Sequence, residues 1–223
     1  MIDIDSLADR GFTVVPGLIG PEQCRMLANL WPDKARFRSH VIMQRHGYGQ
    51  GEYQYFTYPL PEPVEKLRQA LYPELAQVAN RWNEQLGSTK RFPVTLQAWL
   101  RQCHQGGQQR PTPLLLHYGP GDYNCLHRDL YGELVFPLQV TVLLSDPRRD
   151  FSGGEFMLVE QRPRMQSRGE VVPLAQGDAV IFAVNQRPVK GTRGFHRTAM
   201  RHGVSSLRDG ERFTLGIIFH DAA

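Results

Sequence analysis

The chain has 223 residues, of which 41% are apolar and 22% charged, and its formal net charge is +4. This composition excludes a mainly disordered chain, and no apolar stretch approaches the roughly 20 residues that a membrane helix requires. The acidic start MIDIDSLADRG is unlike a secretory signal, and three cysteines without CxxC spacing favour reduced thiols. We therefore expect a cytoplasmic protein without membrane contact, forming a single domain over residues 1–223.

Residues 1–93 are expected to form a mainly helical N-terminal support. The sequence GFTVVPGLI at 11–19 predicts a short buried strand. Apolar residues at helical spacing predict one helix directly after this strand and another over 63–86, which Pro73 should break or kink. Between these helices, segment 45–63 is rich in Gly, Tyr and Pro. It predicts a loop, which either packs on the surface or closes over a ligand.

Residues 94–223 show a strand-like pattern. Short apolar or alternating runs are separated by turn sequences such as YGPGD, AQGD and LRDGE. This arrangement predicts a sandwich or jelly roll, so the fold class is mainly β with flanking α-helices. The predicted strands are 95–101, 113–118, 123–129, 137–144, 154–160, 170–174, 178–184, 201–206 and 211–219.

The stretch NCLHRDLYG at 124–132 contains a His-x-Asp pair. If this segment is extended, alternation places Cys125, His127 and Asp129 on one face. A histidine and a carboxylate side by side can occupy two adjacent corners of an octahedral metal. The pair alone is a weak signal, because a surface turn or a buried His–Asp hydrogen bond would give the same letters.

A third metal ligand should be a histidine on a later strand, and the candidates are His196, His202 and His220. Ten residues after His202 comes Arg212, which opens the apolar run RFTLGIIF. A buried guanidinium there is costly unless it meets an anion. His196 has Ser206 at the same offset, and His220 lies near the end of the sequence. His202 is therefore the predicted ligand, and two histidines with one carboxylate are typical of non-haem Fe(II) oxygenases.

The segments HYGPGDYNCLHRD, FSGGEFML, QGDAVIFA and RHGVSSLRDGERFTLGI resemble the Fe(II)/2-oxoglutarate-dependent dioxygenases, particularly the prolyl-4-hydroxylase-like branch. RGFTVVPGLIGPEQCRML resembles the usual N-terminal entry of that family, so the likeness covers most of the chain. The resemblance implies a double-stranded β-helix, a distorted jelly roll, as the core. It also implies a hydroxylase that uses Fe(II), 2-oxoglutarate and O₂.

The resemblance implies a role for six side chains. The predicted iron ligands are His127, Asp129 and His202, and the predicted 2-oxoglutarate contacts are Arg212, Thr214 and Tyr118. Tyr118 is equally well explained as a core aromatic, and a strand threonine such as Thr214 usually just packs. The charges agree with this assignment: Fe²⁺, one carboxylate ligand and the dianionic cosubstrate leave one negative charge, which the Arg212 guanidinium neutralises.

The resemblance implies hydroxylation of a C–H bond in a protein side chain or small molecule, with release of succinate and CO₂. The related halogenases carry a small residue in place of the carboxylate, so Asp129 favours hydroxylation. The primary substrate stays open. The arginine-bearing segment 160–170 is better explained as a solvated loop, whereas 185–197 is explained equally well as a solvated loop or as a cationic rim. Collagen-type prolyl hydroxylases carry Lys where this chain has Arg212.

Two alternatives remain. One is a non-catalytic jelly-roll protein that binds a metal or ligand. The other is a nucleic-acid demethylase, favoured only by the mildly basic charge. Nucleic acid is an unlikely partner, because those demethylases carry Arg-x-Asn-x-Thr-x-Arg, whereas this chain has Thr214, Gly216 and Ile218 after its arginine.

Overall fold

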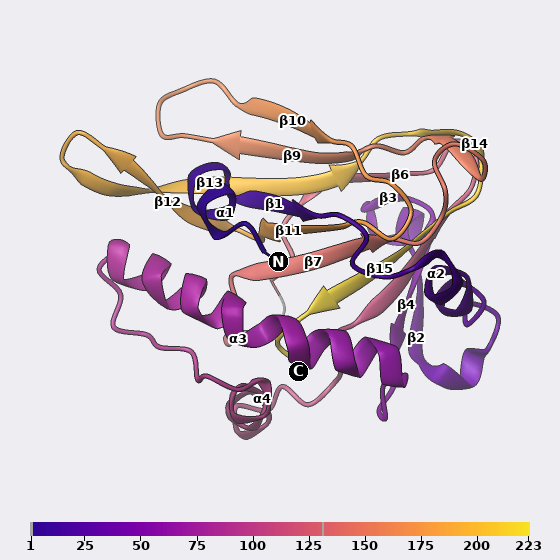
Figure 1. Cartoon of the computed structure of the whole chain (residues 1–223), viewed down its shortest axis with the longest axis horizontal. Coiled ribbons are helices and arrows are strands. Elements are labelled where there is room, and N and C mark those ends of the chain that lie inside the picture. Colours follow the sequence, from indigo (N-terminus) through magenta and orange to yellow (C-terminus); the bar gives the residue numbers. More distant parts are fainter. Residues whose placement is uncertain (1, 131) are drawn as a thin grey trace.

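A computed structural model describes residues 2–130 and 132–223. Two antiparallel sheets face each other, and the helices α3 and α4 lie on the outer side of the larger one (Figure 1). The larger sheet has the strand order β1 (Phe12–Val15), β11 (Ala179–Ala183), β7 (Leu138–Leu143), β15 (Arg212–Ile218), β5 (Leu114–Tyr118), β4 (Glu52–Phe56) and β2 (Phe37–Ile42).

The smaller sheet carries part of the predicted metal site. Its order is β10 (Arg168–Val172), β9 (Phe156–Gln161), β13 (Gly194–Val204), β6 (Tyr123–His127) and β3 (Gly49–Gln50), and β12 (Gln186–Gly191) also pairs with β13. A separate pair consists of β8 (Phe151–Gly153) and β14 (Leu207–Gly210). The prediction of a mainly β chain with a jelly-roll core and flanking helices is confirmed. That residues 1–223 form one domain stays a prediction.

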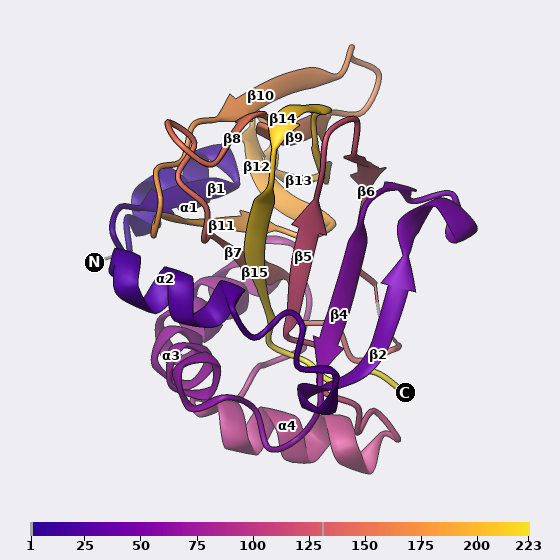
Figure 2. The same ribbon diagram turned by 90° about the vertical axis from the view of Figure 1, so that its right-hand side faces the viewer.

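The helices α2 (Pro21–Ala28), α3 (Glu62–Gln85) and α4 (Leu96–Gln105) lie on the outer side of the larger sheet, as Figure 2 shows from a second side. Helix α1 (Ile4–Arg10) packs beside the edge strand β1, and two 3₁₀ turns, η1 (Lys34–Arg36) and η2 (Met43–His46), complete the helical elements of the described residues. Along α3, Val64, Leu71, Leu75, Val78 and Trp82 are buried at helical spacing. This burial holds α3 as one continuous helix through Pro73, so the predicted break is wrong.

The strand prediction over 95–101 is also wrong, because these residues belong to α4. The Thr95 hydroxyl accepts a hydrogen bond from the backbone N–H of Ala98 at 3.3 Å and caps the helix. The buried residues Leu96, Trp99 and Cys103 stand at helical spacing i, i+3 and i+7, a period that the sequence contains and that the window 95–101 is too short to capture.

The N-terminal 93 residues contain more sheet than expected. The segment 45–63 includes β3 and β4, and β4 lies between β5 and β2 in the larger sheet. Likewise, β12 and β13 form a hairpin across most of 185–197, where loop was predicted. Hydrogen bonds to distant strands, rather than a clear local alternation of apolar residues, hold these segments in the sheets.

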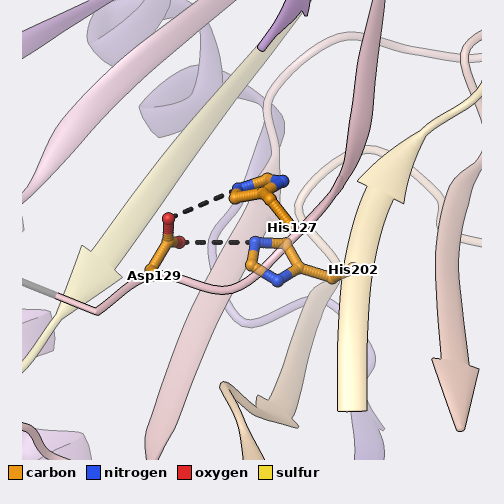
Figure 3. A group of neighbouring side chains, drawn as sticks. All are labelled: His127, Asp129 and His202. Carbon is orange, nitrogen blue, oxygen red and sulfur yellow. Dashed lines mark ion pairs between the residues drawn. The ribbon is translucent and has the colours of Figure 1, made fainter. Parts of the chain in front are cut away.

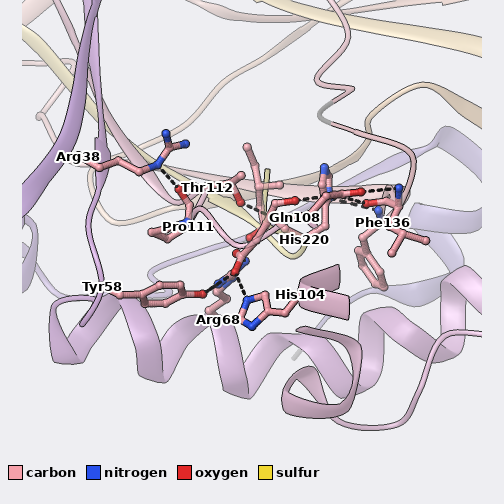
Figure 4. A network of polar contacts seen from close by, with 12 residues as sticks. Arg38, Tyr58, Arg68, His104, Gln108, Pro111, Thr112, Phe136 and His220 are labelled. Carbon is pink, nitrogen blue, oxygen red and sulfur yellow. Dashed lines mark hydrogen bonds and ion pairs between the residues drawn. The ribbon is translucent and has the colours of Figure 1, made fainter. Parts of the chain in front are cut away.

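A buried polar network fastens the last residues of the chain to α3 and α4 (Figure 4). Arg68 and Asp221 are both fully buried and form an ion pair with 2.8 Å between Nη2 and Oδ1. The other oxygen of Asp221 lies 2.8 Å from the Tyr58 hydroxyl and 2.8 Å from His104 Nε2. Arg68 Nε also donates to the carbonyl of Ile218, at the end of β15. The network therefore fixes the end of the strand that begins with Arg212.

Replacing Asp221 with alanine should destabilise the protein by about 3–5 kcal/mol, because the Arg68 guanidinium would stay buried without its carboxylate. Urea unfolding of Asp221→Ala measures this loss, and Asp209→Ala, at an exposed carboxylate, serves as the control. The double change Arg68→Met with Asp221→Leu should recover part of the stability. A single Asp221 variant as stable as the parent would contradict the expectation.

His220 should make stability depend on pH. Burial, and then the nearby Arg68 charge, lower the pKa of His220 from 6.5 to about 4. Its Nδ1 accepts a hydrogen bond from the Phe136 N–H at 3.2 Å, which requires this nitrogen to be unprotonated. The unfolded chain binds a proton near pH 6.5 and the folded chain only near pH 4. The stabilisation is therefore full above pH 6.5 and is lost as the pH falls towards 4.

The loss should approach about 3 kcal/mol at pH 4. Chemical denaturation of the parent and of His220→Gln between pH 7 and 4 measures the difference in slope. Gln44→Ala, at an exposed side chain that does not titrate, should keep the parent slope. Identical slopes for the parent and His220→Gln would disprove the assignment.

Candidate metal centre

Two neighbouring strands of the smaller sheet bring the predicted metal ligands together (Figure 3). His127 is the last residue of β6, and His202 lies directly opposite it on β13. Asp129 follows two residues after β6. Its two carboxylate oxygens lie 3.3 Å from His127 Nε2 and 3.3 Å from His202 Nε2. One nitrogen or oxygen from each residue lies within 4.8 Å of the others, which is the arrangement of three ligands on one face of a metal.

Backbone features set the orientation of the two imidazoles. His127 Nδ1 lies 2.7 Å from the carbonyl oxygen of Cys125, so it carries the proton and leaves Nε2 to face Asp129. A β-bulge separates His202 from Val204, and a side chain at Gly203 would meet the Asn124 carbonyl oxygen at 2.7 Å. Glycine at 203 thus lets β13 approach β6 closely.

His202 packs against the inner side of the larger sheet. Its ring centroid lies 4.6 Å from that of Phe182 on β11, and the side chain is almost completely buried. The ring atom Nδ1 is buried without a hydrogen-bond partner among the described residues. Of the three candidate ligands, only His127 remains partly accessible.

The metal-free cluster holds a carboxylate between two imidazoles. Burial opposes ionisation of Asp129, but hydrogen bonds from His127 and His202 outweigh it and lower its pKa well below the usual range. Burial alone would lower the pKa of His127, yet the hydrogen bond and charge of Asp129 raise it. Burial, together with the His127 charge, lowers the pKa of His202. The site therefore presents an ionised carboxylate, as a divalent cation requires.

A cavity of about 360 Å³ adjoins this cluster, and all six side chains predicted from the sequence line it. Arg212 is fully buried, and its Nε and Nη1 have no hydrogen-bond partner among the described residues. Burial lowers the pKa of Arg212 from 12.5 to about 10, which leaves the guanidinium charged at neutral pH. An unpaired buried cation in a cavity is costly unless an anionic ligand meets it.

Thr214 and Tyr118 share the Arg212 end of the cavity. Arg212 pairs with Tyr118 across β15 and β5, and Thr214 pairs with Leu116. The Arg212 Cζ lies 5.5 Å from the centre of the Tyr118 ring, within cation–π range. The Tyr118 hydroxyl accepts a hydrogen bond from Asn124 at 3.4 Å. Tyr118 is thus both a core aromatic and part of the cavity wall.

Several polar side chains of the cavity were not predicted: Tyr48, Tyr53, Asn124, Gln139 and Thr141. Gln139 is the most informative, because it is buried and its Oε1 has no hydrogen-bond partner among the described residues. A signal for it exists in LQVTVL, where Gln139 and Thr141 alternate with apolar residues that belong to the main core. Two polar residues inside a wholly buried strand indicate a polar cavity.

The remaining predictions for this region had mixed outcomes. In segment 45–63, Tyr48 and Tyr53 line the cavity, whereas Tyr58 binds Asp221 on the far side of the sheet. A small buried thiol is the usual role of a cysteine on such a strand, and this expectation is wrong for Cys125, which is exposed. None of the helices formed by the described residues is long and apolar enough to cross a membrane.

Residues 51–222 match the family described as "Oxygenase, catalysing oxidative methylation of damaged DNA". Two uncharacterized proteins of Mycobacterium tuberculosis, from strains CDC 1551 / Oshkosh and ATCC 25618 / H37Rv, are each 53% identical over 168 residues. These matches cover 75% of this chain and 72% of each relative.

Solved structures extend the comparison to the fold. A Pseudomonas putida prolyl-4-hydroxylase is 15% identical, with a TM-score of 0.56 over 99% of this chain and 97% of that one. A 2OG-Fe(II) oxygenase family protein of Burkholderia pseudomallei is 15% identical, with a TM-score of 0.54 over 99% and 90%. The chain therefore has the fold of the 2-oxoglutarate- and Fe(II)-dependent oxygenases, and it belongs to the oxygenase family that its residues 51–222 match.

Proposed function

We propose that this oxygenase holds Fe(II) through His127, Asp129 and His202 and anchors 2-oxoglutarate through Arg212 to hydroxylate a C–H bond of a second substrate. The observation that carries the proposal is one cavity in which a three-ligand cluster and an unpaired buried guanidinium face the same space. A protein that only bound a metal would have no need for this arginine.

The residues fit the implied metal and cosubstrate. Two imidazoles and one carboxylate form the donor set that non-haem Fe(II) sites use, and they leave three coordination positions open. The Nε and Nη1 of Arg212 have no hydrogen-bond partner among the described residues, so the buried guanidinium keeps donors for a carboxylate. Thr214, next but one on the same strand face, lines the same cavity and supports the same assignment.

When bound, Fe(II) supplies the oxidation chemistry with O₂. The chain supplies placement. His127 and His202 present nitrogen lone pairs in fixed directions, and Asp129 offsets part of the metal charge. Arg212 orients the distal carboxylate of 2-oxoglutarate and restores neutrality. Apolar side chains of the cavity wall, including Leu116, Phe156 and Val204, exclude water from the reacting atoms.

The experiment that tests this proposal uses purified protein under anaerobic conditions. Addition of Fe(II) and then 2-oxoglutarate should produce a weak visible charge-transfer band. Admission of O₂ should then consume 2-oxoglutarate and release succinate, slowly even without a second substrate. His40→Ala, at an exposed histidine outside the cavity, should behave like the parent protein. Absence of both the band and cosubstrate binding at millimolar concentration would refute the proposal and favour the non-catalytic alternative.

Oxidative chemistry on damaged DNA is a second candidate, supported by the description of the matching family. One surface observation favours it. The hairpins β9–β10 and β12–β13 belong to the sheet that carries His127 and His202, and they expose Arg164, Arg168, Lys190, Arg193 and Arg197. Binding of a fluorescent DNA duplex should then weaken steeply with salt. Salt-independent or undetectable binding would leave a protein side chain or a small molecule as the substrate class.

A further inference from the structure

The guanidinium of Arg212 is held in place without a hydrogen bond from Nε or Nη1 to any described residue. Its surroundings are instead the rings of Tyr118 and Phe151, whose centres lie 5.5 and 5.9 Å from Cζ. Packing must therefore decide where this cation points, because directional bonds do not.

The turn that follows β8 packs against the aliphatic part of the Arg212 side chain, and the space there is too small for a side chain at position 154. Gly154 has a φ of +62°, and a Cβ added there would lie 2.9 Å from Arg212 Cδ and 2.7 Å from Leu207 Cδ1. Both neighbours are buried. Alanine at 154 would therefore have to displace the arginine stem or the leucine.

This turn is firmly attached to the segment that leads into Arg212. The N–H of Gly154 donates to the carbonyl of Ser206 at 3.2 Å, and the N–H of Glu155 donates to the Ser205 hydroxyl at 2.9 Å. β8 also pairs with β14, which ends two residues before Arg212. These contacts connect the turn to the segment before Arg212, so a shift of the turn would also shift the backbone of Arg212.

Arg212 also borders a second cavity, of about 390 Å³. Phe151, Gly154 and Glu155 line that second cavity, together with Arg212 itself. The arginine therefore stands between two spaces that could each accommodate its guanidinium.

We infer that Gly154 is a positioning residue for 2-oxoglutarate: the missing side chain lets the turn, with Phe151 beside it, hold the Arg212 guanidinium towards the metal-side cavity. This inference rests on the proposed function of Arg212. It predicts that bulk at position 154 weakens 2-oxoglutarate binding only through the arginine. The metal ligands lie on other strands and should be unaffected.

A double-mutant cycle tests the inference. The proteins are the parent, Gly154→Ala, Arg212→Ala and the combined variant, each loaded anaerobically with Fe(II). Calorimetry measures the Kd for 2-oxoglutarate. In the parent background Gly154→Ala should raise this Kd at least about 10-fold, the scale of one weakened charge-assisted hydrogen bond. In the Arg212→Ala background the same change should alter it less than about 2-fold, because the displaced group is gone.

Two controls separate positioning from general instability. Gly87 has a φ of +69° with no atom within 4 Å of an added Cβ, so Gly87→Ala carries the backbone strain without the collision. It should lower the melting temperature but keep the parent Kd for 2-oxoglutarate. Phe151→Leu adds no bulk, and it should raise the Kd by a smaller factor that also vanishes in the Arg212→Ala background. If Gly154→Ala does not fold, the Phe151 cycle decides the question in its place.

The possible failures are distinct. A parent protein that does not bind 2-oxoglutarate contradicts the proposed function itself. Normal parent binding with an unchanged Kd in Gly154→Ala contradicts only the positioning role. An equal effect of Gly154→Ala with and without Arg212 would show that the turn acts by another route and would also overturn the inference.

Discussion

Replacing Asp129 with asparagine is expected to abolish metal-dependent turnover and to weaken Fe(II) binding at least about 1,000-fold, or about 4 kcal/mol. The substitution keeps the size of the side chain and removes its charge. Asp129 is the one anionic member of the cluster, and its two oxygens face both histidines. A neutral amide offers a divalent cation one weak oxygen donor and no charge compensation.

The Asp129→Asn protein should still fold, because without the buried carboxylate both histidines can stay uncharged and no buried charge is left unpaired. Metal titration by calorimetry and succinate release measure the two effects, and circular dichroism checks the fold. Asp209→Asn, at an exposed carboxylate, is the matched control. Turnover at the parent rate in Asp129→Asn would exclude this residue as a ligand. Full activity in His202→Ala would likewise exclude His202, and His196 would be the next residue to test.

Removing the Arg212 side chain should raise the 2-oxoglutarate requirement 100-fold or more while changing Fe(II) affinity little. The loss of one desolvated, charge-assisted pair costs a few kcal/mol. Arg212→Lys should recover only part of the affinity, because an ammonium lacks the two parallel donors of a guanidinium. Thr214→Val should cost less, on the order of 1 kcal/mol for a single neutral hydrogen bond.

Thermal stability distinguishes this role from a structural one. The Arg212 guanidinium is buried without an ion pair among the described residues, so Arg212→Ala should not destabilise the cosubstrate-free protein through a lost ion pair. A structural role predicts the reverse, a lower melting temperature with an unchanged 2-oxoglutarate requirement. Cosubstrate titrations and melting curves of the Ala, Lys and Val variants discriminate the two. An Arg212→Ala protein that melts early yet saturates normally would place the anchor elsewhere.

The amino-acid sequence by itself was sufficient for the parts of the protein that depend on short-range pattern. The spacing of His127, Asp129, His202 and Arg212, with the turns between them, predicted residues that the fold places around one cavity. Alternation within single strands predicted most of the jelly-roll strands, because the side-chain period of two is a local property of an extended chain.

Other features depended on tertiary structure. β4 takes a place inside that sheet because β5 and β2 offer hydrogen bonds on both of its edges. The Arg68–Asp221 pair joins residues 153 positions apart. No local pattern in the sequence reports such a contact.

The same reason explains the unpredicted cavity residues. The alternation in LQVTVL marks Gln139 as unusual, but which side chains face Gln139 and Gly154 is decided across the fold. The importance of Gly154 appears only once the neighbouring Arg212 side chain is known. The sequence thus determined which groups can perform the chemistry. The packing of two sheets decided how they are oriented, because close approach between distant segments is set by the whole core.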